Sequence, residues 1–261
     1  MIKKSILISV ISTIVFIGIR YGIIHNPNIQ INTSFNLFEF GLTCISAISI
    51  ILGFNFYEEN DEGYDKFAIF NFIGVILGYV IGYRIGNYNL GNLFLIASIL
   101  LFFGISQFKN IPFFKASMLA STIGLSIIFY GVIELLEVVK TDETGYAKLL
   151  FKLIIDAAIF YFLLSTAYLS LKIKNITFEL KKNIGLGILT LLSLLSIYYS
   201  YVNFYKSNTT FIASIILIIA PLLIATFKTF SSTTEKEIKN ISQLVLAIYV
   251  GSSLCLLTNH I

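Results

Sequence analysis

Long apolar runs separated by short polar stretches are the main pattern of this chain. A helix that crosses the hydrocarbon core of a bilayer needs about 20 mostly apolar residues, and each run has roughly that length. The pattern therefore predicts nine membrane-spanning helices joined by short connections. The nine ranges are 5–24, 36–56, 67–86, 90–107, 113–136, 149–171, 184–203, 211–228 and 241–258.

The amino-acid composition points to the same class. Of the 261 residues, 57% are hydrophobic and 12% are charged, whereas an average soluble domain has about 25% charged residues. This charged fraction is too low for the surface of a soluble protein. Intrinsic disorder is also excluded, because disordered chains have low hydrophobicity and high net charge. We expect one all-α, polytopic integral membrane domain over residues 1–261, because the longest connections have only about a dozen residues.

The distribution of Lys and Arg predicts the orientation, because these residues accumulate in cytoplasmic connections. With the N-terminus inside, the inner segments hold twelve of the 18 Lys and Arg residues and the outer segments hold six. We therefore expect an odd number of spans in the cytoplasmic membrane, with the C-terminus outside. The first run resembles a secretory signal peptide, but it has no small-residue cleavage pattern, so we expect a retained helix.

The sequence lacks the residues needed for a disulfide framework, a histidine-based metal centre or a nucleic-acid interface. Cys44 and Cys255 lie in apolar runs, and His25 and His260 are far apart in the sequence. Neither a disulfide framework nor a histidine-based metal centre is predicted. The sequence has no lysine-rich arm and no strip of alternating aromatic and basic residues, so we expect no nucleic-acid partner.

One inner connection breaks the positive trend. Residues 57–66 read YEENDEGYDK and carry five carboxylates against one lysine. Asp61 and Asp65 are four residues apart, which places them on one face of a helix end. Two carboxylates on one face suit Mg²⁺ that also contacts substrate phosphates. The alternative is an acidic connection that only contacts water.

The neighbouring inner connections, 107–115 and 171–183, are basic. Their lysines would suit a diphosphate held by a metal on one side and by ammonium groups on the other. The alternative is that they only reflect the positive-inside rule.

Polar residues inside the runs are a separate group of candidates, because ionisable groups are costly in the bilayer interior. Asp156 is the deepest of them, and we expect it to form a structural pair with Lys152, one turn away. Pro221 interrupts the eighth run, and it is tolerated there where a neighbouring helix accommodates the carbonyl that it frees.

The order of these features resembles the UbiA superfamily of intramembrane prenyltransferases. In that family the motif NDxxDxxxD, often followed by Lys, comes after the second helix. The segment ILGFNFYEENDEGYDK can be laid on it without gaps, which puts Glu58, Asp61 and Asp65 on acidic motif positions and Lys66 on the lysine. Residues 108–134 resemble the family's next special connection, a K-x-x-P turn followed by a helix rich in small residues.

This resemblance implies a UbiA-like nine-helix bundle and a prenyltransferase reaction. The donor would be a polyprenyl diphosphate, and the acceptor an aromatic molecule or a polar lipid. Asp61 and Asp65 would be catalytic and, with Glu58, would hold Mg²⁺. The diphosphate would be bound by Lys66, Lys109, Lys172 and Lys174, with Lys181 and Lys182 as further candidates.

Two departures from the family pattern keep other interpretations open. Tyr57 stands where the motif has Asn, and residues 168–183 contain no aspartate, although the family has a second aspartate motif there. The family's mechanism uses metal at both motifs, so the loss of one favours a non-catalytic relative that binds an isoprenoid lipid. An unrelated small transporter is the third interpretation, although no internal repeat is visible.

Overall fold

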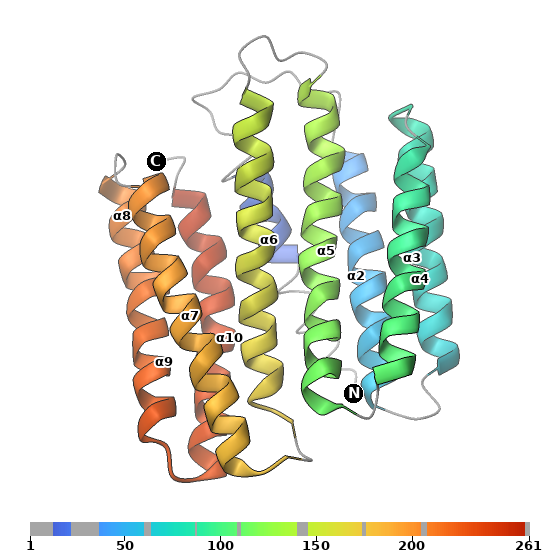
Figure 1. Cartoon of the computed structure of the whole chain (residues 1–261). Helices are drawn as coiled ribbons and strands as arrows, with labels where there is room; N and C mark the ends of the chain where they lie inside the picture. Colours follow the sequence, from blue (N-terminus) through green and yellow to red (C-terminus); the bar gives the residue numbers. More distant parts are fainter. Residues whose placement is uncertain are drawn as a thin grey trace.

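The chain forms a bundle of long helices (Figure 1). The computed structural model describes residues 13–21, 37–59, 64–86, 88–108, 111–139, 146–173, 176–204 and 208–258. Every regular element among these residues is a helix, as the apolar runs predicted.

Residues 13–21 form a short helical segment, and longer helices follow along the chain. They are α2 (Leu37–Glu59), α3 (Tyr64–Arg84), α4 (Asn89–Phe108), α5 (Pro112–Val139), α6 (Tyr146–Ser170), α7 (Phe178–Phe204), α8 (Asn208–Ser214), the π-helix η2 (Ile215–Ile219), α9 (Ala220–Ser231) and α10 (Glu235–Leu257).

The bundle has the length and composition of a membrane-embedded protein. Five stretches in the described part are long and apolar enough to cross a membrane, and many of their large apolar side chains face outward. The five are Asp65–Arg84, Ala147–Ser170, Phe178–Val202, Asn208–Ser231 and Glu235–Leu257. The prediction of an all-α membrane protein is therefore confirmed at this level, and the count of nine spans stays a prediction.

The helices run alternately up and down (Figure 1). We call the end where α3, α5, α7 and α10 begin the lower end, and the end where α4, α6 and α8 begin the upper end. Helices α2 to α5 pack against one another, and α6 packs against α5 on one side and against α7 and α10 on the other. Helix α9 and η2 complete the group around α7 and α10.

Small residues let neighbouring helices approach closely. A Cβ added to Gly74 of α3 would lie 2.6 Å from Ile50 Cγ1 of α2, and the Ser46 hydroxyl donates a 2.8 Å hydrogen bond to the Gly74 carbonyl. Gly131 of α5 leaves similar space for Ile154 of α6. Close approach and interhelical hydrogen bonds are what associate helices in lipid, where apolar burial gives no driving force.

A π-helical stretch interrupts the long helix that runs from α8 to α9. Pro221 has no N–H to donate to the carbonyl of Leu217, four residues earlier, and its ring crowds that carbonyl. The backbone widens at Ile215–Ile219, which is the kind of local adjustment that accommodates a proline. The Leu217 carbonyl lies against α10, where a Cβ on Gly251 would be 2.8 Å from its oxygen.

Candidate functional site

Three of the residues that the resemblance implicates, Asp65, Lys66 and Lys172, lie at the lower end of the described bundle. Asp65 and Lys66 lie in the first turn of α3 and are exposed, and Lys172 is exposed directly after α6. Glu58 belongs to the last turn of α2, but its side chain is outside the described part. Asp61, Lys109 and Lys174 lie outside the described residues. The predicted metal site therefore stays a prediction, and no cluster of three or more His, Cys, Asp or Glu occurs among the described residues.

Lys172 is held against an aromatic ring. Its ammonium donates a hydrogen bond to the Tyr168 hydroxyl, one turn earlier, and lies 3.9 Å from the centroid of the Tyr168 ring. A cation over a ring face is attracted by the ring's quadrupole. The Lys172 charge is thus positioned at the lower end by its own helix and stays exposed to a ligand.

Lys181 and Lys182, the further candidates for a diphosphate contact, each have a hydrogen-bond partner within the bundle. The Lys181 ammonium lies 2.9 Å from both carboxylate oxygens of Glu235, and its side chain is only 6% exposed. Lys182 donates a 2.9 Å hydrogen bond to the carbonyl of Ser232. These two lysines connect the start of α7 with Ser232, in the turn before α10, and with Glu235, the first residue of α10. Their contacts stabilise the packing of these segments.

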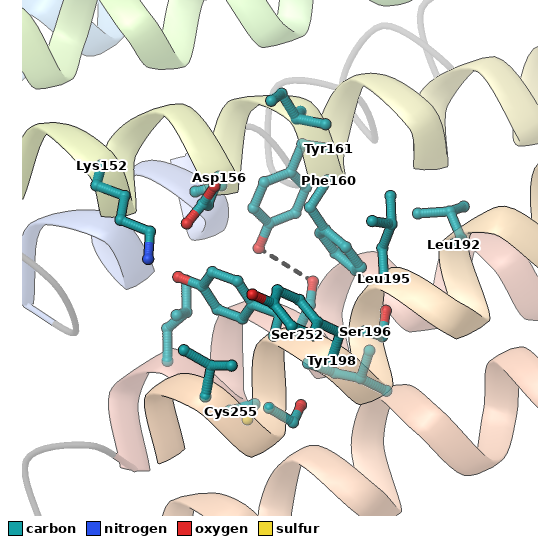
Figure 2. Close-up of a pocket in the computed structure, with 17 residues that line it drawn as sticks. Lys152, Asp156, Phe160, Tyr161, Leu192, Leu195, Ser196, Tyr198, Ser252 and Cys255 are labelled. Atoms are coloured by element: carbon teal, nitrogen blue, oxygen red, sulfur yellow. Dashed lines mark hydrogen bonds between the residues drawn. The ribbon is translucent and has the colours of Figure 1, made fainter. Parts of the chain in front are cut away.

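A cavity of about 250 Å³ lies between α6, α7, η2 and α10, in the upper half of the bundle (Figure 2). Its walls are mainly apolar and include Phe160, Leu192 and Leu195. Polar side chains reach it at two depths, with Lys152 and Asp156 nearer the upper end and Tyr161, Ser196 and Ser252 deeper.

Lys152 and Asp156, the pair that the sequence suggested, face the same cavity. They interact electrostatically along α6, but no ion pair within 4.0 Å joins these two described side chains. Tyr199 of α7 also lies close enough to Asp156 to interact with its charge. The expected pair is therefore present as an electrostatic interaction without a contact within 4.0 Å, and both charges line the cavity.

Tyr161 and Ser252, on the deep side of the cavity, belong to a larger group of hydrogen-bonded hydroxyls that we call the hydroxyl cluster: Tyr161, Ser165, Tyr249, Ser252 and Ser253. The Ser252 hydroxyl donates to the Tyr161 hydroxyl over 3.0 Å (Figure 2), and Ser253 lies 3.0 Å from the same oxygen. The Tyr249 hydroxyl donates a 3.3 Å bond to the Tyr161 carbonyl and is also hydrogen-bonded to Ser165. This cluster joins α6 to α10 inside the apolar bundle.

Ser196 differs from the cluster because its hydroxyl has no partner. The residue is 4% exposed, and its Oγ makes no hydrogen bond with any described group. One turn earlier, Ser193 donates to the Leu189 carbonyl of its own helix over 2.8 Å, which is the usual solution for a serine in a helix. A buried polar group without a partner is costly, so Ser196 marks a place where a ligand could supply the missing bond.

Sequence reasoning missed most of the residues around this cavity. It identified Asp156 as an ionisable residue within a span and Lys152 as its neighbour, but it assigned no role to Phe160, Tyr161 or Ser196. One usable signal was present on α7, where Ser193, Ser196 and Ser200 recur at helical spacing on one face. The tyrosine and serines of α10 gave no comparable signal, because their partners lie on another helix.

No protein-family model, no curated protein and no solved structure matches this chain. The resemblance to the UbiA superfamily therefore continues to depend on the motif residues and on the order of the helices.

Proposed function

We propose that this protein is a UbiA-like membrane protein that binds a polyprenyl diphosphate with Mg²⁺ at the lower end of the bundle. Its reaction would be transfer of the polyprenyl group to an aromatic or polar-lipid acceptor. The observation that supports this proposal is the shared location of Asp65, Lys66 and Lys172, which all lie at the lower end of apolar helices.

The chemistry of the ligand fits such a location. A polyprenyl diphosphate has a strongly anionic head and a long apolar tail, so its head must lie where the membrane meets water and its tail must follow apolar surface. The lower end combines exposed charges with helices whose surfaces are apolar. The diphosphate head would contact Lys66 and Lys172, and the tail would extend along the bundle.

The proposal includes the orientation of the chain in the cytoplasmic membrane. Lysines are concentrated at the lower end, which favours its assignment to the cytoplasm, with nine crossings and the C-terminus outside. The described lysines at or near this end are Lys66, Lys172, Lys181, Lys182, Lys228, Lys236 and Lys239.

The residues of this chain would have separate roles in the reaction. Asp65 is an exposed carboxylate in the first turn of α3, and with Asp61 and Glu58 it would hold Mg²⁺, a cation that prefers oxygen ligands. Bound Mg²⁺ stabilises the negative charge that develops on the departing diphosphate. The lysines would hold the phosphate oxygens in place while the acceptor attacks the prenyl carbon.

A thermal unfolding experiment tests the proposal. The purified chain in detergent is titrated with a long-chain polyprenyl diphosphate, in the presence of Mg²⁺ or of a chelator. A ligand that binds only the folded state stabilises it by about 2.7 kcal/mol at a hundred times its dissociation constant. We expect stabilisation that requires Mg²⁺ and is lost in the double variant Asp61→Asn/Asp65→Asn.

Asp156→Asn is the matched control, because it makes the same chemical change at the other end of the bundle and should leave the stabilisation intact. Stabilisation that is the same with Mg²⁺ and with chelator, and the same in the double variant, would contradict the metal site. An absence of any stabilisation would contradict diphosphate binding altogether.

A non-catalytic lipid-binding relative is the second candidate. It is favoured by the engagement of Lys181 and Lys182 with Glu235 and Ser232, which leaves the connection after α6 with fewer cations for a leaving diphosphate. A labelled polyprenyl diphosphate separates the two candidates. Release of diphosphate with prenylation of membrane lipids or added aromatic acceptors indicates a transferase, and retention of intact donor indicates binding alone.

A further inference from the structure

The cavity between α6, α7, η2 and α10 presents two opposite charges that do not neutralise each other directly. Lys152 and Asp156 both line it, one helical turn apart, and no ion pair within 4.0 Å joins them. An ammonium and a carboxylate in this situation can each form a charge-assisted hydrogen bond with a ligand. A ligand with an anionic and a cationic group close together complements both residues.

Ser196 adds a third requirement, deeper in the cavity. Its buried hydroxyl has no partner among the described residues, and Figure 2 shows the side chain beside the apolar wall. Tyr199, which lies near Asp156, is three residues closer to the upper end. At a rise of about 1.5 Å per residue, Ser196 lies about 4.5 Å below the level of Tyr199 along α7. A complementary ligand has a hydrogen-bonding atom at that depth.

The rim of the cavity indicates where such a ligand comes from. Ile159 of α6 and Leu195 and Tyr198 of α7 all line the cavity, and all are exposed on the outer surface of the bundle. Lipid covers that surface in a membrane-embedded bundle. The cavity therefore opens sideways between α6 and α7 toward the bilayer, so its ligand can enter from the bilayer.

We infer that this cavity binds a zwitterionic amphiphile, and the sideways opening favours a lipid with a phosphoethanolamine headgroup. The ammonium of the headgroup contacts Asp156, and its phosphate contacts Lys152. The ester carbonyl below the phosphate accepts a hydrogen bond from Ser196, and the start of an acyl chain occupies the apolar part. This site lies at the opposite end from Asp65 and Lys172, so the inference does not depend on the proposed function.

Lipid titration of the delipidated full-length chain in detergent tests the inference, with thermal unfolding as the readout. The probes are phosphatidylethanolamine, phosphatidylglycerol, which lacks the ammonium, and phosphatidylcholine, whose quaternary ammonium has no N–H to donate. Phosphatidylethanolamine should stabilise the protein at the lowest concentration. In Lys152→Gln, Asp156→Asn and Ser196→Ala, the half-maximal concentration should rise about tenfold, the effect of one lost hydrogen bond of this kind.

Two controls keep the result specific. Lys148→Gln removes an exposed lysine one turn before Lys152 that does not line the cavity, so it should leave the titration unchanged. Asp65→Asn should also leave it unchanged, even if it abolishes diphosphate binding. The two sites can thus fail independently.

Equal stabilisation by the three lipids, or titrations that the three cavity variants leave unchanged, would overturn the inference. A further arm uses free phosphoethanolamine. If it stabilises the protein as well as the lipid does, and if the three cavity variants weaken both effects equally, the cavity binds a zwitterion and the ligand is a soluble molecule. Failure of the free headgroup, together with success of the lipid, supports the lipid.

Discussion

Tyr161 is the side chain that most directly links the cavity to the helices around it. It is fully buried, its hydroxyl contacts Ser252 and Ser253, and its ring lies 5.6 Å from that of Tyr249. An interhelical hydrogen bond in a membrane contributes about 0.6 kcal/mol on average, whereas removal of a buried aromatic ring costs about 3–5 kcal/mol. The ring therefore contributes more than the hydroxyl to the contact between α6 and α10.

Two substitutions of Tyr161 separate these contributions. We expect Tyr161→Phe to lower the free energy of unfolding in detergent by about 1 kcal/mol, because it removes only the hydroxyl. Tyr161→Ala should lower it by about 3–5 kcal/mol, because it also leaves a cavity. Tyr198→Phe is the control, since that side chain is 68% exposed and should change stability little. Equal losses in the two Tyr161 variants would show that the ring contributes nothing.

Single residues around the cavity differ in how well the sequence reveals them. Asp156 can be recognised as a candidate from the sequence, because a carboxylate inside an apolar run is costly and therefore unusual. Ser196 cannot be recognised in this way, because nothing in the sequence distinguishes it from Ser193, whose hydroxyl donates a hydrogen bond to the Leu189 carbonyl of the same helix. The difference between these two serines depends on which neighbouring atoms surround them, and only the packed structure defines those neighbours.

The contact between η2 and α10 lies close to Pro221, the proline that interrupts the long helix from α8 to α9. Pro221 has no N–H to donate to the Leu217 carbonyl, and that carbonyl lies in the π-helical stretch against Gly251 of α10. A side chain at position 251 would meet backbone, which cannot move aside as a flexible side chain can. Gly251 is therefore required by close approach between two elements.

A pair of glycine substitutions tests this explanation. Gly251→Ala should destabilise the protein by about 1–3 kcal/mol, the usual cost of forcing a methyl group into a packed contact. Gly187→Ala, in α7, places its Cβ in open space and should stabilise the helix by about 0.5–1 kcal/mol. Thermal unfolding of the two variants in one detergent gives the comparison. Stabilisation in both would mean that η2 and α10 are not in close contact.

The start of α7 shows why the ends of elements were harder to predict than their existence. The apolar pattern predicted a span over 184–203, but the helix begins at Phe178. Its first turns carry Glu179, Lys181 and Lys182, which an apolar run excludes. The Thr177 hydroxyl caps this start locally by accepting a 3.4 Å hydrogen bond from the Leu180 N–H. Lys181 and Lys182 add contacts with Glu235 and with the turn before α10, and such contacts between distant segments leave no local signal.

The whole molecule has two chemically different ends. The lower end carries most of the described lysines, together with Asp65 and the exposed Lys172, whereas the cavity with Lys152 and Asp156 is near the upper end. Successive helices alternate between these ends, which is the arrangement that repeated crossings of a membrane require. The direction of the bundle in the membrane therefore decides which compartment meets each site.

Cysteine labelling in intact cells tests that direction. The native cysteines, Cys44 and Cys255, are buried, so the unmodified chain provides the background. We expect a membrane-impermeant maleimide to label Lys148→Cys at the upper end from outside. Lys236→Cys, at the lower end, should be labelled only after the membrane is opened. The reverse pattern would place the lower end outside and would contradict the proposed cytoplasmic diphosphate site.

At this largest scale the sequence predicted an all-α bundle of long apolar helices, but it did not predict which helices are neighbours. The runs account for α2 to α10, because a helix long enough to span a bilayer has a composition that can be recognised locally. The cavity depends on α6 meeting both α7 and α10. That arrangement depends on side-chain packing between segments that are up to a hundred residues apart, as in the hydrogen bond between Tyr161 and Ser252.

The sideways opening between Ile159 of α6 and Leu195 of α7 has a consequence for how occupancy is controlled. A ligand that enters through this rim moves in two dimensions, so its relevant concentration is its mole fraction among the lipids and not its amount per litre of buffer. Diluting vesicles would leave the cavity filled, whereas raising the detergent-to-lipid ratio would empty it. Purification itself would then act as a titration of this site.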